Sequence, residues 1–240
     1  MNDSDKHSPY LEHHFDTLQQ QYESTQLGMW IFLATEIMLF GGLFVGYAVF
    51  RSEHPEIFRY ASRFLDVNLG GLNTIVLICS SLTMAWAVRA AQLSQNKILF
   101  NTLLATFLLA CAFLGIKAIE YEHKWKHGLL WGEKYQAQTH ETQNESADAP
   151  EHMEVTEQEP EVETAGEPKN VHLFFGIYFS MTGLHAIHVI VGMAFLIFLM
   201  VKTRQGVYHA QNFTFVDMFG LYWHIVDIIW IFLFPLLYLI

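Results

Sequence analysis

The sequence predicts an all-α integral membrane protein with five transmembrane helices. Of its 240 residues, 52% are hydrophobic and 15% are aromatic, and five long segments carry almost no charge. A helix rises about 1.5 Å per residue and the hydrocarbon core is about 30 Å thick, so roughly 20 apolar residues suffice to cross it. Five such spans leave no room for a separate soluble domain. We expect the spans at Leu27–Phe50, Gly71–Gln92, Leu99–Ile116, Leu173–Val201 and Phe219–Ile240.

The first span follows a polar segment, residues 1–26, and opens a transmembrane domain of residues 27–240. Within the polar segment, Tyr10–Tyr22 is compatible with a short surface helix. The apolar run Leu27–Phe50 is longer than the roughly 7–15 apolar residues of a cleavable signal. We therefore expect this run to stay in the mature chain as an anchor.

The second and third spans are joined by a short link that contains Lys97, so we expect them to be antiparallel neighbours. A loop with Pro55 and three arginines leads into the second span. Cys79 and Cys111 fall inside these two spans. Lone thiols behave as small hydrophobic side chains, so both are predicted to be small buried residues.

Between the third and fourth spans lies an acidic segment, residues 133–168. It holds 11 Asp and Glu residues and one Lys, a net charge of −10 out of −11 for the whole chain. The segment has few large apolar residues, so we interpret it as disordered or ordered by a partner. A solvated spacer is the alternative. The remaining 204 residues are nearly neutral and lack the basic surface that nucleic acid binding requires.

Glu36 lies near the middle of the first span and is its one Asp, Glu, Lys, Arg or His residue. A carboxylate at that depth costs about 2.5–3.5 kcal/mol on insertion scales. It is tolerated where it faces protein, water or a partner. Glu36 is therefore the first candidate functional residue.

The fourth span carries His185 and His188, which a spacing of three places on one helix face. Nearby small residues, including Gly176 and Gly192, would let another helix approach closely.

The fifth span carries a stripe of Trp223, Asp227 and Trp230 at i, i+4 and i+7. An intramembrane carboxylate therefore lies between two indoles. His224 precedes Asp227 by three residues and could pair with it.

Three interpretations of these polar groups remain open. His185, His188 and His224 could ligate a haem or metal. Glu36, the histidines and Asp227 could form a proton relay. The same groups could instead hydrogen-bond between helices or to lipid headgroups. Outside them the spans contain no phosphate-binding loop, no Gly-rich dinucleotide turn and no Ser/His/Asp arrangement, so we expect no covalent chemistry by this chain alone.

Four sequence blocks, in order along the chain, resemble subunit III of haem–copper cytochrome c oxidases. They are Gly28–Phe44 (GMWIFLATEIMLFGGLF), Ile116–Tyr121 (IKAIEY), Thr182–Gly192 (TGLHAIHVIVG) and Tyr222–Trp230 (YWHIVDIIW). The resemblance implies a five-span bacterial form that lacks the first two of seven family helices.

The resemblance also implies the role of the chain. Subunit III holds no haem, copper or other metal; the catalytic subunit I carries the haems and one copper, and subunit II carries the other copper site. Subunit III packs beside subunit I, holds phospholipids and supports oxygen access and proton uptake. Glu36 matches the carbodiimide-reactive glutamate of the family. The other characteristic polar positions of the family are matched by Glu120, His185, His188, Trp223, His224 and Asp227.

Two departures from the family matter. Lys117 stands where mitochondrial members often have glutamine, and the acidic segment is additional. In five-span relatives subunit I often supplies extra helices, so two chains are expected to build the lipid cleft. The family topology places the acidic segment on the outer side, where it could attract cytochrome c or dock another respiratory complex.

The expected location is the bacterial inner membrane, with a cytoplasmic amino terminus and a periplasmic carboxyl terminus. The charge count opposes this orientation, because five Lys and Arg residues fall on the amino-terminal side and eight on the other. We follow the family topology, since the lysines near the acidic segment lie in a long loop.

The cytochrome c branch of the family is favoured by Ala34–Glu36 (Ala-Thr-Glu), because quinol-type relatives tend to carry Asp in place of Glu. A quinol oxidase or nitric-oxide-reductase relative is the nearest alternative. A self-sufficient haem-binding membrane cytochrome is the alternative from another class. A proton-coupled transporter is disfavoured because the sequence shows no inverted repeat.

Overall fold

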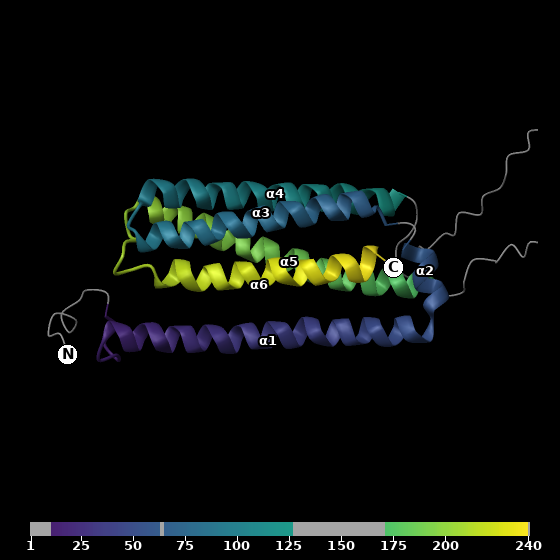
Figure 1. The fold of residues 1–240 in the computed structure, drawn as a ribbon, viewed down its shortest axis with the longest axis horizontal. Coiled ribbons are helices and arrows are strands. Elements are labelled where there is room, and N and C mark those ends of the chain that lie inside the picture. The colour runs from purple at the N-terminus through teal and green to yellow at the C-terminus, as the bar shows by residue number, and fades with distance from the viewer. Residues whose placement is uncertain (1–10, 63–64, 127–170, 240) are drawn as a thin grey trace, which may run out of the picture.

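The computed structural model describes residues 11–62, 65–126 and 171–239, and these residues form six helices. Figure 1 shows the long helices lying nearly parallel along one axis, with the short helix α2 at one end. Their bounds are α1 Leu18–Glu53, α2 Pro55–Ser62, α3 Val67–Gln92, α4 Asn96–Lys126, α5 Val171–Arg204 and α6 Thr214–Tyr238.

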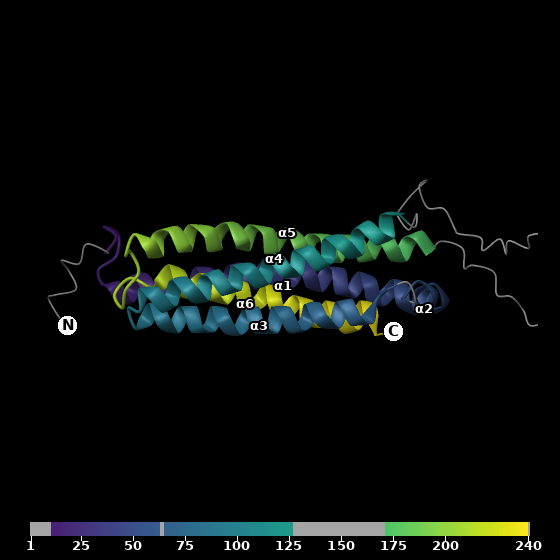
Figure 2. The same ribbon diagram turned by 90° about the horizontal axis from the view of Figure 1, so that it is seen from above.

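Five of the helices, all except α2, are long and apolar enough to cross a membrane. The five predicted spans and the all-α class are confirmed, and the chain is a multi-pass integral membrane protein. Helices α3, α4, α5 and α6 pack around one another, with the expected antiparallel contact between α3 and α4. Helix α1 lies along the side of this bundle against α6 and α5, as Figures 1 and 2 show.

Helix α1 begins within the polar amino-terminal segment. The Thr17 side chain accepts a hydrogen bond from the Gln20 amide at 3.1 Å and caps the helix. The prediction of a separate surface helix at Tyr10–Tyr22 is therefore wrong for its described part, because residues 18–22 are the first turn of α1. The predicted span was shorter because it counted apolar residues, whereas a helix continues into water beyond them.

Helix α2 was not predicted. It is a short amphipathic helix that follows α1 directly and buries Ile57, Phe58 and Ala61. The Phe58 ring packs edge-on against Tyr47 at 5.1 Å and Phe174 at 5.2 Å between centroids. This helix therefore ties the end of α1 to the beginning of α5.

Close helix approach occurs at particular glycines. A Cβ on Gly192 of α5 would lie 2.6 Å from the Trp223 ring of α6, and one on Gly220 would lie 2.8 Å from Val88 of α3. Gly192 thus has the predicted role. A Cβ on Gly176, in contrast, would meet no described atom within 4 Å.

Two further expectations concern the cysteines and the acidic segment. Cys79 and Cys111 are exposed on the outside of the bundle, so the prediction that they are buried is wrong. A small apolar side chain suits a lipid-facing surface as well as a core, which is why composition did not distinguish the two. The acidic segment, residues 133–168, lies outside the described residues.

Candidate functional site

Glu36 of α1 faces His188 of α5. The Glu36 Oε2 atom lies 2.9 Å from His188 Nε2, and each side chain is 15% exposed. The Phe40 ring, one turn further along α1, packs edge-on against the imidazole at 5.3 Å between centroids. The intramembrane carboxyl therefore faces the bundle, as its cost in lipid requires.

The hydrogen bonds of His188 fix the number of protons in this pair. His188 Nδ1 lies 2.8 Å from the Leu184 carbonyl oxygen, which can only accept, so Nδ1 carries a hydrogen. Nε2 then either accepts a hydrogen bond from a protonated Glu36 carboxyl group or donates a hydrogen bond to an ionised Glu36 carboxylate. In both forms one proton lies between Glu36 and His188.

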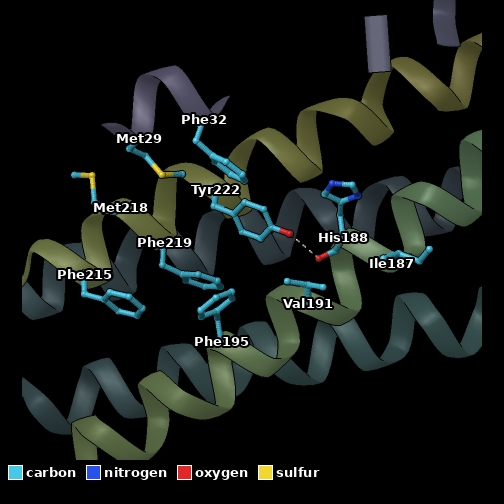
Figure 3. Close-up of a pocket in the computed structure, with 10 residues that line it drawn as sticks. All are labelled: Met29, Phe32, Ile187, His188, Val191, Phe195, Phe215, Met218, Phe219 and Tyr222. Atoms are coloured by element: carbon cyan, nitrogen blue, oxygen red, sulfur yellow. Dashed lines mark hydrogen bonds between the residues drawn. The ribbon is translucent and has the colours of Figure 1, made fainter. Parts of the chain in front are cut away.

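An apolar cavity of about 450 Å³ lies beside this pair, between α1, α5 and α6. Figure 3 shows the Tyr222 phenol pointing at the His188 carbonyl oxygen, to which it donates at 2.9 Å. The Phe32 and Phe219 rings lie beside the Tyr222 ring, at 6.1 and 6.0 Å between centroids. Its ten lining residues are Met29, Phe32, Ile187, His188, Val191, Phe195, Phe215, Met218, Phe219 and Tyr222.

A second cavity, of about 940 Å³, adjoins the first at the end of the bundle where α1 begins. The two share Met29, Phe32, Phe215 and Met218 in their linings. The second cavity is lined by apolar side chains together with amide and hydroxyl side chains and the carboxyl group of Glu12, and none of its described lining residues is Lys or Arg. Together they form a recess that is polar at the bundle end and apolar toward His188.

Within the described residues, side-chain hydrogen bonds between α1 and the bundle lie at its start, middle and end. Near its start the Tyr22 phenol donates to Asp217 at 2.7 Å, and near its end the Tyr47 phenol donates to the Leu236 carbonyl oxygen. The Glu36–His188 contact lies between them. Because little of α1 is buried, these contacts fix its position beside α5 and α6.

The His185 side chain contacts different helices from those that the His188 side chain contacts. Its side chain is fully buried against Trp230 and Phe113, at 5.2 and 5.6 Å between ring centroids. Neither imidazole nitrogen has a hydrogen-bond partner in the described part of the chain.

The predicted pairing of His224 with Asp227 is wrong. His224 Nδ1 lies 2.7 Å from the Ser81 hydroxyl of α3 instead. Asp227 is buried, and neither carboxyl oxygen has a partner among residues 11–62, 65–126 and 171–239. Side chains three apart on a helix share a face, but the ring of His224 turns toward the neighbouring helix.

The two indoles of the α6 stripe attach that helix to α3. The Trp223 Nε1 donates to Ser80 at 2.9 Å and the Trp230 Nε1 donates to Thr74 at 3.2 Å. Trp223 therefore makes an interhelical contact.

Glu120 belongs to a buried cluster at the other end of the bundle. Its Oε2 accepts from Lys117 Nζ at 2.8 Å, and its Oε1 accepts from the phenols of Tyr238 at 2.6 Å and Tyr178 at 2.9 Å. The Lys117 ammonium also lies 4.3 Å from the centroid of the Trp230 ring. Sequence reasoning missed this pair, although an acid and a base three apart on a helix give a visible signal.

The three candidate histidines thus have different surroundings: His188 contacts α1, His185 contacts α4 and α6, and His224 contacts α3. Across the described residues, no group of three or more His, Cys, Asp and Glu side chains is arranged to hold a metal ion. No hydrogen bond within those residues continues from Glu36 and His188 to His185 or Asp227, so the predicted relay is not connected there.

Comparison with known proteins identifies similar chains. Residues 2–125 and 158–240 match the sequence model of a family described as "Cytochrome c oxidase subunit III". The chain is 27% identical over 215 residues to "Cytochrome c oxidase subunit 3" of Thermostichus vulcanus, which covers 89% of this chain and 86% of that protein.

Two further relatives differ in their names. The chain is 28% identical over 224 residues to "Heme-copper oxidase subunit I+III" of Aeropyrum pernix, covering 88% of this chain and 22% of that protein. It is 22% identical over 233 residues to "Probable quinol oxidase subunit 3" of Staphylococcus saprophyticus, covering 96% and 97%.

Proposed function

Because the chain belongs to the cytochrome c oxidase subunit III family, we propose that it is the non-redox subunit III of a proton-pumping cytochrome c oxidase. The observation that carries this proposal is the family match, which spans all five transmembrane helices. In this role the chain packs beside subunit I, which with subunit II passes electrons from cytochrome c to oxygen. A relative in which subunits I and III are one chain supports the contact with subunit I.

Two observations favour the cytochrome c branch over a quinol oxidase. The Thermostichus relative is 27% identical and the Staphylococcus relative 22% identical. The Ala34–Glu36 block carries Glu, where quinol-type members tend to carry Asp.

The branch is tested by purifying the complex from its native membrane through a tag on this chain. The cytochrome c branch predicts a co-purifying subunit II with bound copper, detected by metal analysis and electron paramagnetic resonance. A complex that oxidises quinol and has a copper-free subunit II would assign the chain to the other branch.

The supporting role rests on the recess beside Glu36 and His188. An amphiphile matches its shape, because the recess is polar where α1 begins and apolar toward His188. Phospholipid in this recess would separate the proton-sharing pair from water. Dioxygen is apolar and leaves water readily, so the same recess would offer it a path through the subunit toward subunit I.

A cavity-filling variant tests this role. Val191→Phe places a ring in the apolar cavity, whereas Ile190→Phe places one on the exposed face of the same helix. Both variants are purified as the whole oxidase. We expect Val191→Phe to retain less lipid and to lose activity sooner during sustained turnover. Equal lipid content and equal lifetimes in the two variants would refute the role of the recess.

The location and the acidic segment complete the proposal. We place the chain in a bacterial inner membrane with a cytoplasmic amino terminus; cysteine labelling from each side of the membrane tests this orientation. Residues 133–168, with a net charge of −10, would then face cytochrome c and attract its basic surface. If deletion of this segment leaves donor binding unchanged at both low and high salt, that attraction does not exist.

A further inference from the structure

Three buried side chains in the membrane-spanning helices have polar atoms without a hydrogen-bond partner among the described residues. They are Asn73 of α3, His185 of α5 and Asp227 of α6, and each is at most 2% exposed. Buried polar groups in proteins are nearly always hydrogen-bonded, either to protein or to ordered water, because an unpaired one costs free energy. These side chains therefore indicate a ligand that can both donate and accept hydrogen bonds.

Asp227 and Asn73 lie in the interface between α6 and α3. Asp227 shares a helix face with Trp223 and Trp230, and the indoles of both donate to hydroxyl groups of α3. On the other side of the interface, Asn73 directly precedes Thr74, which accepts the bond from Trp230. The carboxyl and the amide are therefore close to one interhelical hydrogen bond, from opposite helices.

The separation of the two groups suits one bridging water molecule. The indoles of α6 contact α3 in reverse order of residue number, so the two helices are antiparallel. Trp230 is level with Thr74, the residue after Asn73. Asp227 therefore lies four residues from the level of Asn73, about 6 Å along the axis at 1.5 Å per residue. A water molecule with a hydrogen bond of about 2.8 Å on each side spans such a distance.

His185 approaches the same indole from α5. Its ring lies 5.2 Å from the Trp230 ring between centroids. The Lys117 ammonium lies 4.3 Å from the Trp230 centroid, and it is paired with Glu120. The polar groups around Trp230 thus come from α3, α4, α5 and α6.

The ligand of these groups is small and neutral. Full burial of Asn73 and His185 excludes a bulky molecule. Across the described residues no three His, Cys, Asp and Glu side chains gather to hold a metal ion. Water fits both limits, because buried water typically makes two to four hydrogen bonds to polar groups that lack other partners.

We propose that ordered water is bound inside the bundle around Trp230, with one molecule bridging Asp227 and Asn73 and another bonded to His185. This site goes beyond the supporting role proposed above, because none of the three side chains lines the recess beside Glu36. It does not depend on which oxidase the chain serves. The bound water joins α3, α5 and α6 through hydrogen bonds that their side chains do not make directly.

Hydroxyl-radical footprinting of the intact oxidase tests for internal water. X-ray pulses generate radicals from bound as well as bulk water, and these radicals oxidise the nearest side chains. Trp230 is fully buried, so its oxidation reports water inside the bundle. We expect dose-dependent oxidation of Trp230 in the unmodified protein. An unoxidised Trp230 would overturn the proposal, and this result requires no variant to assemble.

A double-variant cycle tests the bridge between Asn73 and Asp227. Asn73→Leu and Asp227→Leu each leave the other group without its bridge, whereas the double variant removes both polar groups. Groups that share a partner are energetically coupled, so we expect the double variant to lose less in thermal midpoint than the two single losses together. It should also show less Trp230 oxidation than the unmodified protein. Additive losses, or unchanged oxidation, would overturn the bridge.

Thr203→Val is the matched control for this cycle. It removes a buried hydroxyl that bonds to the Leu199 carbonyl oxygen of its own helix, near the end of α5. Its loss in thermal midpoint should add to that of Asp227→Leu, because distant sites without a shared partner are independent. Trp230 oxidation should stay at the unmodified level in Thr203→Val. Equal coupling of Asp227 to Thr203 and to Asn73 would remove the evidence for a bridge and overturn it.

Discussion

The Glu36 carboxyl and the His188 imidazole are joined by one hydrogen bond between α1 and α5. Because Nδ1 of His188 donates to the Leu184 carbonyl oxygen, Nε2 faces the carboxyl with a single shared proton. A neutral donor at position 36 can therefore replace the acid. An apolar side chain cannot, and it would leave a largely buried nitrogen without a partner.

Glu36→Gln is expected to assemble normally and to change sustained turnover only modestly, because its amide can donate to His188 Nε2. Glu36→Leu is expected to lower stability by about 1–3 kcal/mol through the lost partner. Yield of assembled complex and oxygen consumption over prolonged turnover measure both effects. A correctly assembled Glu36→Gln enzyme with no oxygen reduction at all would contradict this expectation.

Lys117→Met is expected to destabilise the protein by about 3–5 kcal/mol, because it leaves Glu120 buried without its ammonium partner. The double variant Lys117→Met/Glu120→Gln removes both charges and should recover part of the loss. Thermal unfolding of the purified complex in detergent measures each change. If the double variant is no more stable than the single one, the charge pair is not the cause.

Among the elements, α5 and α6 depend on the space that Gly192 leaves for the Trp223 ring. Gly192→Ala is expected to cost about 1–3 kcal/mol, because its Cβ would lie 2.6 Å from a ring held by a hydrogen bond to Ser80. Gly183→Ala, on the same helix, gives the same gain in helix propensity, and its Cβ meets no described atom within 4 Å. Unfolding of the two variants in detergent measures the difference. Equal stability would show that the ring can move aside.

The sequence allowed the long helices to be predicted and not the short one. An apolar run of about 20 residues has few alternatives to a membrane helix. Helix α2 has only eight residues, and its apolar side became meaningful once Phe58 had Tyr47 and Phe174 to pack against. The start of α1 was missed because a helix in water leaves no apolar signal.

The candidate site was predictable only in part. Glu36 was identified from its cost in lipid, but 152 residues separate it from His188, and no local pattern connects them. Local spacing misled at His224 and Asp227, because it fixes the helix face and not the direction of a side chain. The cavities, which are lined by residues from separate elements of the chain, had no counterpart in the sequence.

At the scale of the whole molecule, large apolar side chains cover the outside of the bundle. Trp30, Ile37 and Met38 of α1 and Leu82 and Trp86 of α3 are each more than half exposed. In water such a surface would aggregate, whereas in a membrane it faces lipid or another subunit. The exposed apolar surface that requires a bilayer is therefore also suited to contact with other membrane subunits.

The chain purified alone is expected to show no stoichiometric haem or copper absorption, because its three intramembrane histidines lie against different helices. An absorption spectrum with metal analysis checks this, with the whole complex as the positive control. A stoichiometric Soret band in the isolated chain, together with reduction of a substrate, would support the self-sufficient haem cytochrome instead.

The distance along the chain between Glu36 and His188 has a consequence for biosynthesis. At about 5–20 residues per second, a ribosome needs roughly 8–30 s to make the intervening 152 residues. Throughout that interval the Glu36 carboxyl of α1 has no His188 to bond with, and inserting it into the membrane costs about 2.5–3.5 kcal/mol. Residues 27–50 include 12 Leu, Ile, Phe and Val residues, each worth about 0.3–0.6 kcal/mol. Helix α1 can therefore insert by itself, and the hydrogen bond between Glu36 and His188 forms only after α5 has been made.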